Sequence, residues 1–285
     1  MKIKVILWDI DGTILNFIEA EKAAIKMCFA QFQLGECSDE MIARYSVINK
    51  SYWERLELGE ISKQEVLEGR FREFFRWEGI SLEGEIRSNG KNVPEDDLVR
   101  RFNVEYQKRL GDTICFHDDA YELIRRLKGR VKQYAVTNGT RMAQERKLER
   151  SGLSQLFDGV FISEDVGIEK PNKEFFDYVF RQIGDYEKDE IMIVGDSLSS
   201  DMKGGNNAGI VCCWYHPQEA GQESSGLGSL SWESSSQGSS RGELASQESL
   251  CLEPPTLSRK NSATQPQRLR IDYEIQNLWQ VEEII

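Results

Sequence analysis

The amino-acid sequence predicts an α/β fold built on a parallel β-sheet. Short apolar runs of strand length recur at 4–8, 132–136, 159–163, 191–194 and 211–215. From the second run onward they alternate with helical patterns at 118–127, 140–151, 173–183 and 200–208. Strands that alternate with helices form βαβ units with right-handed crossovers, which place the strands parallel in one sheet.

The first two strands are separated by a long segment with no comparable strand pattern. Helical patterns occupy it at 18–32, 38–58, 62–77 and 96–110. Ser38 and Ser62 stand at helix starts, where a hydroxyl caps free backbone amides, and Glu65 completes a capping box with Ser62. We predict an all-helical domain at 17–110, inserted in the first strand–helix connection, with a loop at 79–94 inside it.

The composition changes abruptly near residue 218. Residues 218–267 are dense in Ser, Gly, Gln and Glu and carry no periodic apolar pattern, so we predict a disordered insertion. The runs 271–275 and 278–285 then read as a last strand and helix that return to the sheet. The predicted catalytic core is therefore 1–16, 111–217 and 268–285.

The chain is acidic, with 285 residues and a formal net charge of −12. This charge argues against nucleic acid or an anionic membrane as the main partner. The six cysteines show no CxxC pair and no zinc-site spacing, which favours reduced thiols in a cytosolic protein. The first apolar run is too short for a signal peptide, and no run is long enough to span a bilayer. We expect a cytoplasmic monomer or homodimer that acts on a small molecule.

Two acidic side chains follow the first predicted strand directly, in the string Asp9-Ile10-Asp11-Gly12-Thr13. Open α/β sheets bind their ligands just beyond the C-terminal ends of strands. Adjacent carboxylates there contribute nothing to packing, but they suit a hard divalent cation and phosphoryl chemistry. The string therefore predicts a metal-assisted phosphoryl site.

Three further strand ends carry polar residues. Thr137-Asn138-Gly139 can direct amide and hydroxyl donors at a phosphate, although an ordinary helix cap explains the tripeptide as well. Lys170 precedes Pro171 and either supplies a positive charge or opens a solvated helix. Asp196 and Asp201 place carboxylates at a strand tip and in the first helical turn, which suits Mg²⁺ or, alternatively, a helix cap.

Taken in order, these sites resemble the four motifs of the haloacid dehalogenase superfamily: DxDGT, a strand-terminal Thr, a Lys and GDxxxxD. The resemblance covers the chain apart from the Ser-rich segment. It implies a Rossmann-like core in which the helical segment forms a C1-type cap. It also implies that Asp9 is the nucleophile and Asp11 the general acid/base.

The same resemblance assigns the remaining motif residues. Thr137 and Lys170 would bind the phosphoryl group, assisted by the backbone of Asn138. Asp9, the Asp11 carbonyl and Asp196 would hold Mg²⁺, with Asp201 acting on the metal or on Lys170. The chemistry is consistent, because a carboxylate that attacks a phosphate anion needs nearby positive charge to offset the repulsion.

A closer resemblance, to the bacterial pyrimidine 5′-nucleotidases, lies in four stretches: 137–139, 148–153, 161–167 and 170–178. It implies an Mg²⁺-dependent hydrolase of nucleoside 5′-monophosphates, with pyrimidines preferred. Two departures from that group are the loop at 79–94 and the Ser-rich segment. Three alternatives remain open at this point: a sugar-phosphate or phosphoglycolate phosphatase, a phosphoglucomutase, and a non-enzymatic scaffold that uses the Ser-rich segment.

Substrate contacts outside the motifs are predicted on the helical segment. Asn49 and Trp53 stand one helical turn apart, where they could hydrogen-bond and stack on a base, and Phe17 could form a second wall. The alternative is that these side chains pack inside the helical bundle. A row of arginines in the same segment, including Arg70 and Arg76, is predicted to form a solvated face.

Overall fold

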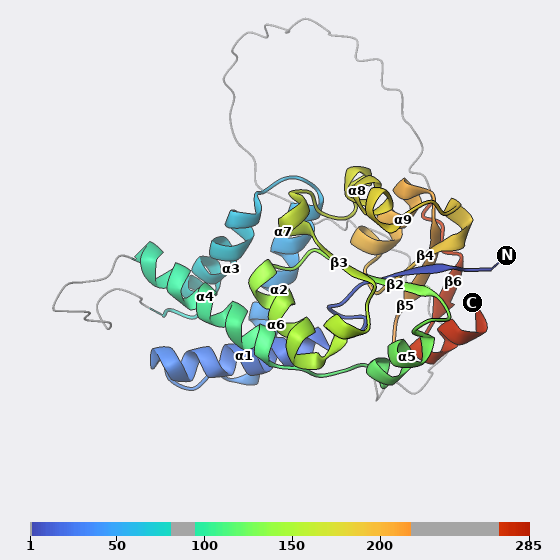
Figure 1. The fold of residues 1–285 in the computed structure, drawn as a ribbon. Helices are drawn as coiled ribbons and strands as arrows, with labels where there is room; N and C mark the ends of the chain where they lie inside the picture. The colour runs from blue at the N-terminus through green and yellow to red at the C-terminus, as the bar shows by residue number, and fades with distance from the viewer. Residues whose placement is uncertain (1, 81–94, 218–267) are drawn as a thin grey trace, which may run out of the picture. The chain divides into compact units, whose positions relative to one another are not determined.

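Six parallel strands of the described part of the chain form one sheet, as the alternation of strands and helices predicts (Figure 1). This is seen in a computed structural model, which describes residues 2–80, 95–217 and 268–285. The strands are β1 (Val5–Trp8), β2 (Lys132–Thr137), β3 (Gly159–Ile162), β4 (Ile191–Gly195), β5 (Val211–Tyr215) and β6 (Tyr273–Ile275). Their order is β3-β2-β1-β4-β5-β6, which confirms the predicted α/β class.

The sheet changes its winding direction at β1. The chain runs outward through β2 and β3 on one side of β1, and through β4, β5 and β6 on the other. Crossover helices leave the strand ends on opposite faces at such a point, so a crevice opens beyond the C-terminal ends of β1, β2 and β4. Asp9, Thr137 and Asp196 stand at those three ends.

Both faces of the sheet are covered, because alternate residues of β1 point to opposite sides. Ile6 and Trp8 pack with α5 (Ala120–Leu127), α6 (Arg141–Ser151) and the C-terminal 3₁₀ helix η4 (Leu278–Glu283). Val5 and Leu7 pack with α8 (Lys173–Ile183) and α9 (Lys203–Ala208). Figure 1 shows α8 and α9 on the opposite side of the sheet from α5. A single-turn helix, α7 (Ser163–Val166), follows β3.

The segment between β1 and β2 is helical where it is described. It contains α1 (Phe17–Phe32), α2 (Asp39–Glu57), α3 (Lys63–Trp77) and α4 (Glu95–Asp112), which share an aromatic cluster around Phe71. The predicted caps are present: Ser38 accepts from the amide of Met41, and Ser62 forms the capping box with Glu65. Gly79 and Ile80 are the last described residues of the predicted loop, and 81–94 lie outside the described residues.

The predicted boundary between the catalytic core and the helical domain stays a prediction. Both parts belong to one compact unit, Met1–Pro217 with Leu269–Ile285. The predicted disordered insertion at 218–267 lies outside the described residues. After it, β6 forms as expected but is shorter, and the last helix is 3₁₀. Among the described residues, no helix is long and apolar enough to cross a membrane.

The predicted helix at 200–208 differs in its first turn. A π-helical turn, Leu198–Met202, precedes α9, and the amide of Met202 donates to the carbonyl of Ser197 five residues earlier. The side chain of Asp201 accepts from the amide of Ser197 at 3.1 Å, which helps to hold the wide turn. Single π turns occur often at functional sites, and this one carries the second acid of the GDxxxxD motif.

Candidate active site

Asp9 lies at the end of β1, almost completely buried and held from two sides. Lys170 Nζ donates to Asp9 Oδ1 at 2.7 Å. The hydroxyl of Thr13 lies 3.3 Å from Asp9 Oδ2 and 3.1 Å from Asp196 Oδ1, so it sits between two carboxylates. The orientation of Asp9 is therefore set by the protein before any ligand is present.

Gly12 lets the first loop approach the GDxxxxD loop closely. Its φ is +91°, and a Cβ at this position would lie 2.5 Å from Asp196 Oδ2. Both the backbone conformation and the available space exclude a larger residue. The glycine of DxDGT is thus explained by the close contact between the two acidic loops.

Lys170 is fully buried and its three N–H donors are all used. Besides Asp9, its ammonium donates to Asp201 Oδ1 at 2.6 Å and to the carbonyl of Val136 at 2.9 Å. Burial alone would lower the pKa of Lys170, but Asp201 and Asp9 outweigh it and raise the pKa. The side chain is a fixed positive charge beside the predicted nucleophile.

Two carboxylates that Lys170 binds, Asp9 and Asp201, form a cluster with a third, Asp196. Oxygen atoms of Asp9, Asp196 and Asp201 all lie within 4.8 Å of one another. Burial, with the repulsion of neighbouring acids, raises the pKa of Asp9 well above its usual range and that of Asp196 to about 7. The cluster therefore has more negative charge than Lys170 can neutralise. An all-oxygen, carboxylate-rich donor set fits Mg²⁺.

The loop after β2 is tied to the loop that carries Lys170. The side-chain amide of Asn138 donates to the carbonyl of Lys170 at 2.8 Å and accepts from its amide at 2.8 Å. Thr137 is buried, and its hydroxyl oxygen accepts from the amide of Gly139 at 3.1 Å, which leaves its own proton to donate. Two of the predicted phosphate-binding segments thus form one rigid assembly.

Asp11 points to a different set of partners. Gln144 Nε2 donates to Asp11 Oδ2 at 2.6 Å, and the buried ammonium of Lys147 pairs with Oδ1. Both partners come from α6, and the sequence analysis missed both. The carboxylate of Asp11 is not part of the three-acid cluster among the described residues, and the role of its carbonyl at a metal stays a prediction.

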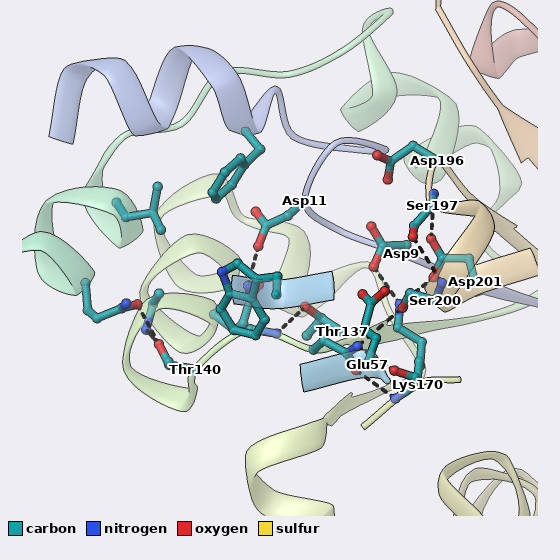
Figure 2. A pocket seen from close by; sticks show the side chains of 18 of the residues that line it. Asp9, Asp11, Glu57, Thr137, Thr140, Lys170, Asp196, Ser197, Ser200 and Asp201 are labelled. Carbon is teal, nitrogen blue, oxygen red and sulfur yellow. Dashed lines mark hydrogen bonds and ion pairs between the residues drawn. The ribbon is translucent and has the colours of Figure 1, made fainter. Parts of the chain in front are cut away.

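A cavity of about 190 Å³ joins these residues to the helical segment (Figure 2). At one end Figure 2 groups Asp9, Asp196, Asp201 and Lys170, and Thr140 is well separated from them. The helical segment contributes six side chains to the lining: Phe17, Trp53, Glu57, Arg70, Gln107 and Leu110.

Two of the three predicted contacts on the helical segment line this cavity, and the third does not. Phe17 and Trp53 are lining residues. Asn49 is only 3% exposed and lies inside the helical bundle. Its side-chain Nδ2 donates to Glu21 at 2.8 Å, and its Oδ1 accepts from Arg70 at 2.6 Å. We therefore leave Asn49 out of the proposed site.

The prediction that Arg70 lies on a solvated face is wrong, although Arg76 is exposed as expected. The Arg70 side chain is 1% exposed, packs over the rings of Phe71 and Tyr106, and lines the cavity. Glu57 was also missed. Burial raises its pKa to about 7, and the hydroxyl of Ser199 donates to it at 2.7 Å.

Comparison with known proteins identifies the family. The family model for haloacid dehalogenase-like hydrolases matches residues 3–209. The chain belongs to the haloacid dehalogenase-like hydrolases. It is 34% identical over 214 residues to the HAD-hydrolase YfnB of Bacillus subtilis, covering 75% of this chain and 84% of that protein.

Two further relatives of this hydrolase have a named activity. The pyrimidine 5′-nucleotidase PynA of Streptococcus pneumoniae is 35% identical, with 75% of this chain and 84% of PynA covered. The pyrimidine 5′-nucleotidase YjjG of Escherichia coli is 29% identical, with 76% and 87% covered. The predicted family and enzyme class, a phosphatase of this superfamily, are confirmed.

This hydrolase is similar to a crystal structure of YfnB from Bacillus subtilis, which is bound to magnesium and is described as revealing interdomain movement. The match has a TM-score of 0.72 and 27% identity, and covers 100% of this chain and 99% of that one. The Rossmann-like fold expected from the sequence is confirmed by this match and by the sheet order.

Proposed function

We propose that this hydrolase is an Mg²⁺-dependent phosphomonoesterase that acts on nucleoside 5′-monophosphates, pyrimidine nucleotides preferred, through an aspartyl-phosphate. The main structural support for this proposal is the cavity, which is lined by Asp9 and Lys170 and also by the aromatic side chains of Phe17 and Trp53. The relatives PynA and YjjG, named as pyrimidine 5′-nucleotidases, and the magnesium in the YfnB structure support the same assignment.

In the first step, the carboxylate of Asp9 attacks phosphorus and the ester oxygen leaves. Lys170 lies 2.7 Å from Asp9 and lowers the repulsion between the carboxylate and the phosphate anion. In this mechanism the hydroxyl of Thr137 donates its proton to the phosphoryl oxygens as they gain charge. Asp11 gives its proton to the departing oxygen and then takes one from the water that hydrolyses the acyl phosphate.

Asp9, the Asp11 carbonyl and Asp196 would hold Mg²⁺, with Asp201 close enough to join them or to act through Lys170. When bound, the cation supplies positive charge that brings the carboxylate and the phosphate dianion together. Asp201 is fixed by Lys170 and by the amide of Ser197, so its contribution does not depend on substrate.

The other end of the cavity suits a leaving group that carries a planar base with polar edges. Phe17 and Trp53 supply aromatic faces, and Arg70 and Gln107 supply hydrogen-bond donors. A pyrimidine carries carbonyl oxygens that can accept from such donors. Binding energy from the base can be used at the reacting phosphorus only if the base and phosphate are bound together.

A phosphate-release assay tests this function. UMP, dTMP, AMP and ribose 5-phosphate are compared in Mg²⁺ and in EDTA, with Asp9→Asn as the blank. We expect kcat/KM for UMP and dTMP to exceed that for ribose 5-phosphate at least tenfold, since stacking and hydrogen bonds to a base are worth a few kcal/mol. Equal values would favour a sugar phosphatase, and full activity in EDTA would refute the metal-dependent mechanism.

A further inference from the structure

Lys63 connects the helical segment to the phosphate-binding loop. It is the first residue of α3, directly after the capping serine, and its side chain is 15% exposed. Its ammonium donates to the carbonyl of Asn138 at 2.9 Å, to the hydroxyl of Ser163 at 2.9 Å and to the carbonyl of Gly139 at 3.3 Å. All three N–H donors of the ammonium are therefore used on the far side of the interface.

The partners of Lys63 are mostly neutral oxygens. Glu169, the one carboxylate in ion-pair range among the described residues, is 3.7 Å away, a longer separation than the hydrogen bonds to the two carbonyls. Burial lowers the pKa of Lys63, and the negative charge of Glu169 opposes that effect. An ordinary surface ion pair would leave the ammonium in water beside a single acid. Here the ammonium is enclosed by main-chain and hydroxyl oxygens from two core loops.

The loop that Lys63 contacts is the one that carries the phosphate-binding residues. Asn138, whose carbonyl accepts from Lys63, also binds the backbone of Lys170 in both directions. The amide of Gly139 donates to Thr137 Oγ1. Lys63 thus binds the carbonyls of a turn whose side chains and amides organise the phosphoryl site.

On the helical segment, Lys63 lies against a wall of the leaving-group cavity. Its ammonium is 5.8 Å from the centre of the Trp53 ring, within range of a cation–π contact. Trp53 lines the cavity, and Lys63 does not. The same charged atom therefore contacts both the aromatic wall and the phosphate loop, although Lys63 does not line the cavity.

We propose that Lys63 is a positioning residue that sets the spacing between the leaving-group wall at Trp53 and the phosphoryl site at 137–139. A substrate that touches both ends of the cavity depends on this spacing. A substrate that reaches only the phosphoryl site does not, because Asn138 and Lys170 still hold that site together. The expected difference between substrates rests on the proposed nucleotidase function. The link itself, the hydrogen bonds of Lys63 to Asn138, Gly139 and Ser163, does not.

The test compares Lys63→Met, which keeps most of the aliphatic stem, with Lys50→Met as control. Lys50 is 78% exposed on α2 and pairs weakly with Glu54, so its loss makes the same charge change away from the interface. For Lys63→Met we expect KM for UMP to rise about tenfold or more, with kcat/KM for ribose 5-phosphate within about twofold of wild type. Lys50→Met should match wild type on both substrates.

A purely structural role for Lys63 would lower both activities in parallel with the melting temperature, and that result would overturn the proposal. If Lys63→Met does not fold, Ser163→Ala removes only one partner of the ammonium. This variant should show the same split between the two substrates at about threefold, in line with loss of a single hydrogen bond. Equal effects on both substrates would count against the proposal.

Amide hydrogen exchange separates a failure of this proposal from a failure of the nucleotidase function. Exchange is measured without substrate in wild type, Lys63→Met and Lys50→Met. We expect Lys63→Met alone to speed exchange in peptides covering 137–141 and the start of α3. Unchanged exchange at 137–141 would refute the link, whatever the enzyme hydrolyses. Faster exchange in an enzyme that prefers ribose 5-phosphate would keep the link and reject the nucleotide.

Discussion

Two buried cations line the same cavity but have different partners. Lys170 and Arg70 are each 1% exposed. Lys170 forms short ion pairs with Asp9 and Asp201. Arg70 binds two neutral amide oxygens, those of Asn49 at 2.6 Å and Asn103 at 3.1 Å, and Asn49 in turn donates to the carboxylate of Glu21.

This difference shows how the two ends of the cavity are specialised. At the Lys170 end, a positive ammonium lies beside the carboxylates of Asp9 and Asp201. The proposed reaction between two anions, a carboxylate and a phosphate, requires such a positive charge. At the Arg70 end, Nε is buried without a hydrogen-bond partner among the described residues. A buried donor without an acceptor costs free energy, so this end would gain from an uncharged ligand oxygen. One end is suited to phosphoryl transfer and the other to recognition.

The largest effect that tests this difference between the two ends is expected at the Lys170 end. Asp9→Asn removes the proposed nucleophile with almost no change in shape, and we expect turnover to fall at least ~10³-fold while the melting temperature stays near that of wild type. Phosphate release and thermal unfolding, measured on the same preparation, check both parts. Activity within tenfold of wild type would remove Asp9 from the nucleophile role.

Asp196→Asn tests the excess negative charge of the same end. In the folded protein, burial raises the pKa of Asp196 to about 7, so the ionised form is disfavoured and stability is lost as pH rises from about 4 toward 7. The amide cannot ionise. In EDTA at pH 8 we therefore expect Asp196→Asn to melt higher than wild type, although its activity falls about 100-fold.

The shift of the melting temperature on adding Mg²⁺ is the matching control for the role of Asp196. Ligand binding to the folded state raises the melting temperature of wild type, and loss of a ligand residue should abolish most of that shift. A variant that is less stable than wild type in EDTA, or that keeps the full magnesium shift, would contradict the role given to Asp196.

At the Arg70 end of the cavity, Arg70→Met should affect recognition more than chemistry. Loss of a charge-assisted hydrogen bond costs roughly 1.5–3 kcal/mol, so we expect kcat/KM for UMP to fall about 10- to 100-fold. The value for ribose 5-phosphate should change far less. Arg76→Met, on the exposed face of the same helix, is the control. A parallel loss on both substrates would assign Arg70 to bundle stability alone.

Glu57 offers the smallest effect, a pH-dependent change in stability. Burial raises its pKa from 4.5 to about 7, so wild type loses stability as pH rises through this interval. Glu57→Gln keeps an acceptor for Ser199 but cannot ionise. In EDTA it should be more stable than wild type by about 1–2 kcal/mol at pH 8 and no more stable at pH 4.5. Urea unfolding at both pH values measures the difference.

Much of the fold could be read from local patterns. The apolar runs predicted five of the strands to within a residue or two, because buried parallel strands are apolar on both faces. The motif residues were found because their spacing from strand ends is short and the sheet brings those ends together. The π turn before α9 was missed, since it depends on hydrogen bonds of Ser197 and Asp201 that no apolar period encodes.

Three of the residues that the sequence analysis missed share one physical reason. Lys63, Arg70 and Lys147 are charged residues on helices, and a charge on a helix normally faces water. Whether such a residue is buried depends on what packs opposite it, and here those partners lie 75 or more residues away for Lys63 and 136 away for Lys147. A pattern over one helix cannot contain that information. Asn49 was misplaced for the related reason that its partners, Glu21 and Arg70, fill the interior of the bundle.

The last strand is attached to the sheet by contacts that need no continuous chain between β5 and β6. Asn206 on α9 binds the backbone of Arg270 in both directions at 2.8 Å, and Asp272 accepts from the amide of Cys212 at 2.9 Å. Ile275, Leu278 and Val281 are then buried against the sheet. A peptide of residues 268–285 carries its side of every one of these contacts. It should therefore restore a truncated protein that ends at residue 217, and the enzyme could serve as a two-fragment reporter whose activity depends on reassembly.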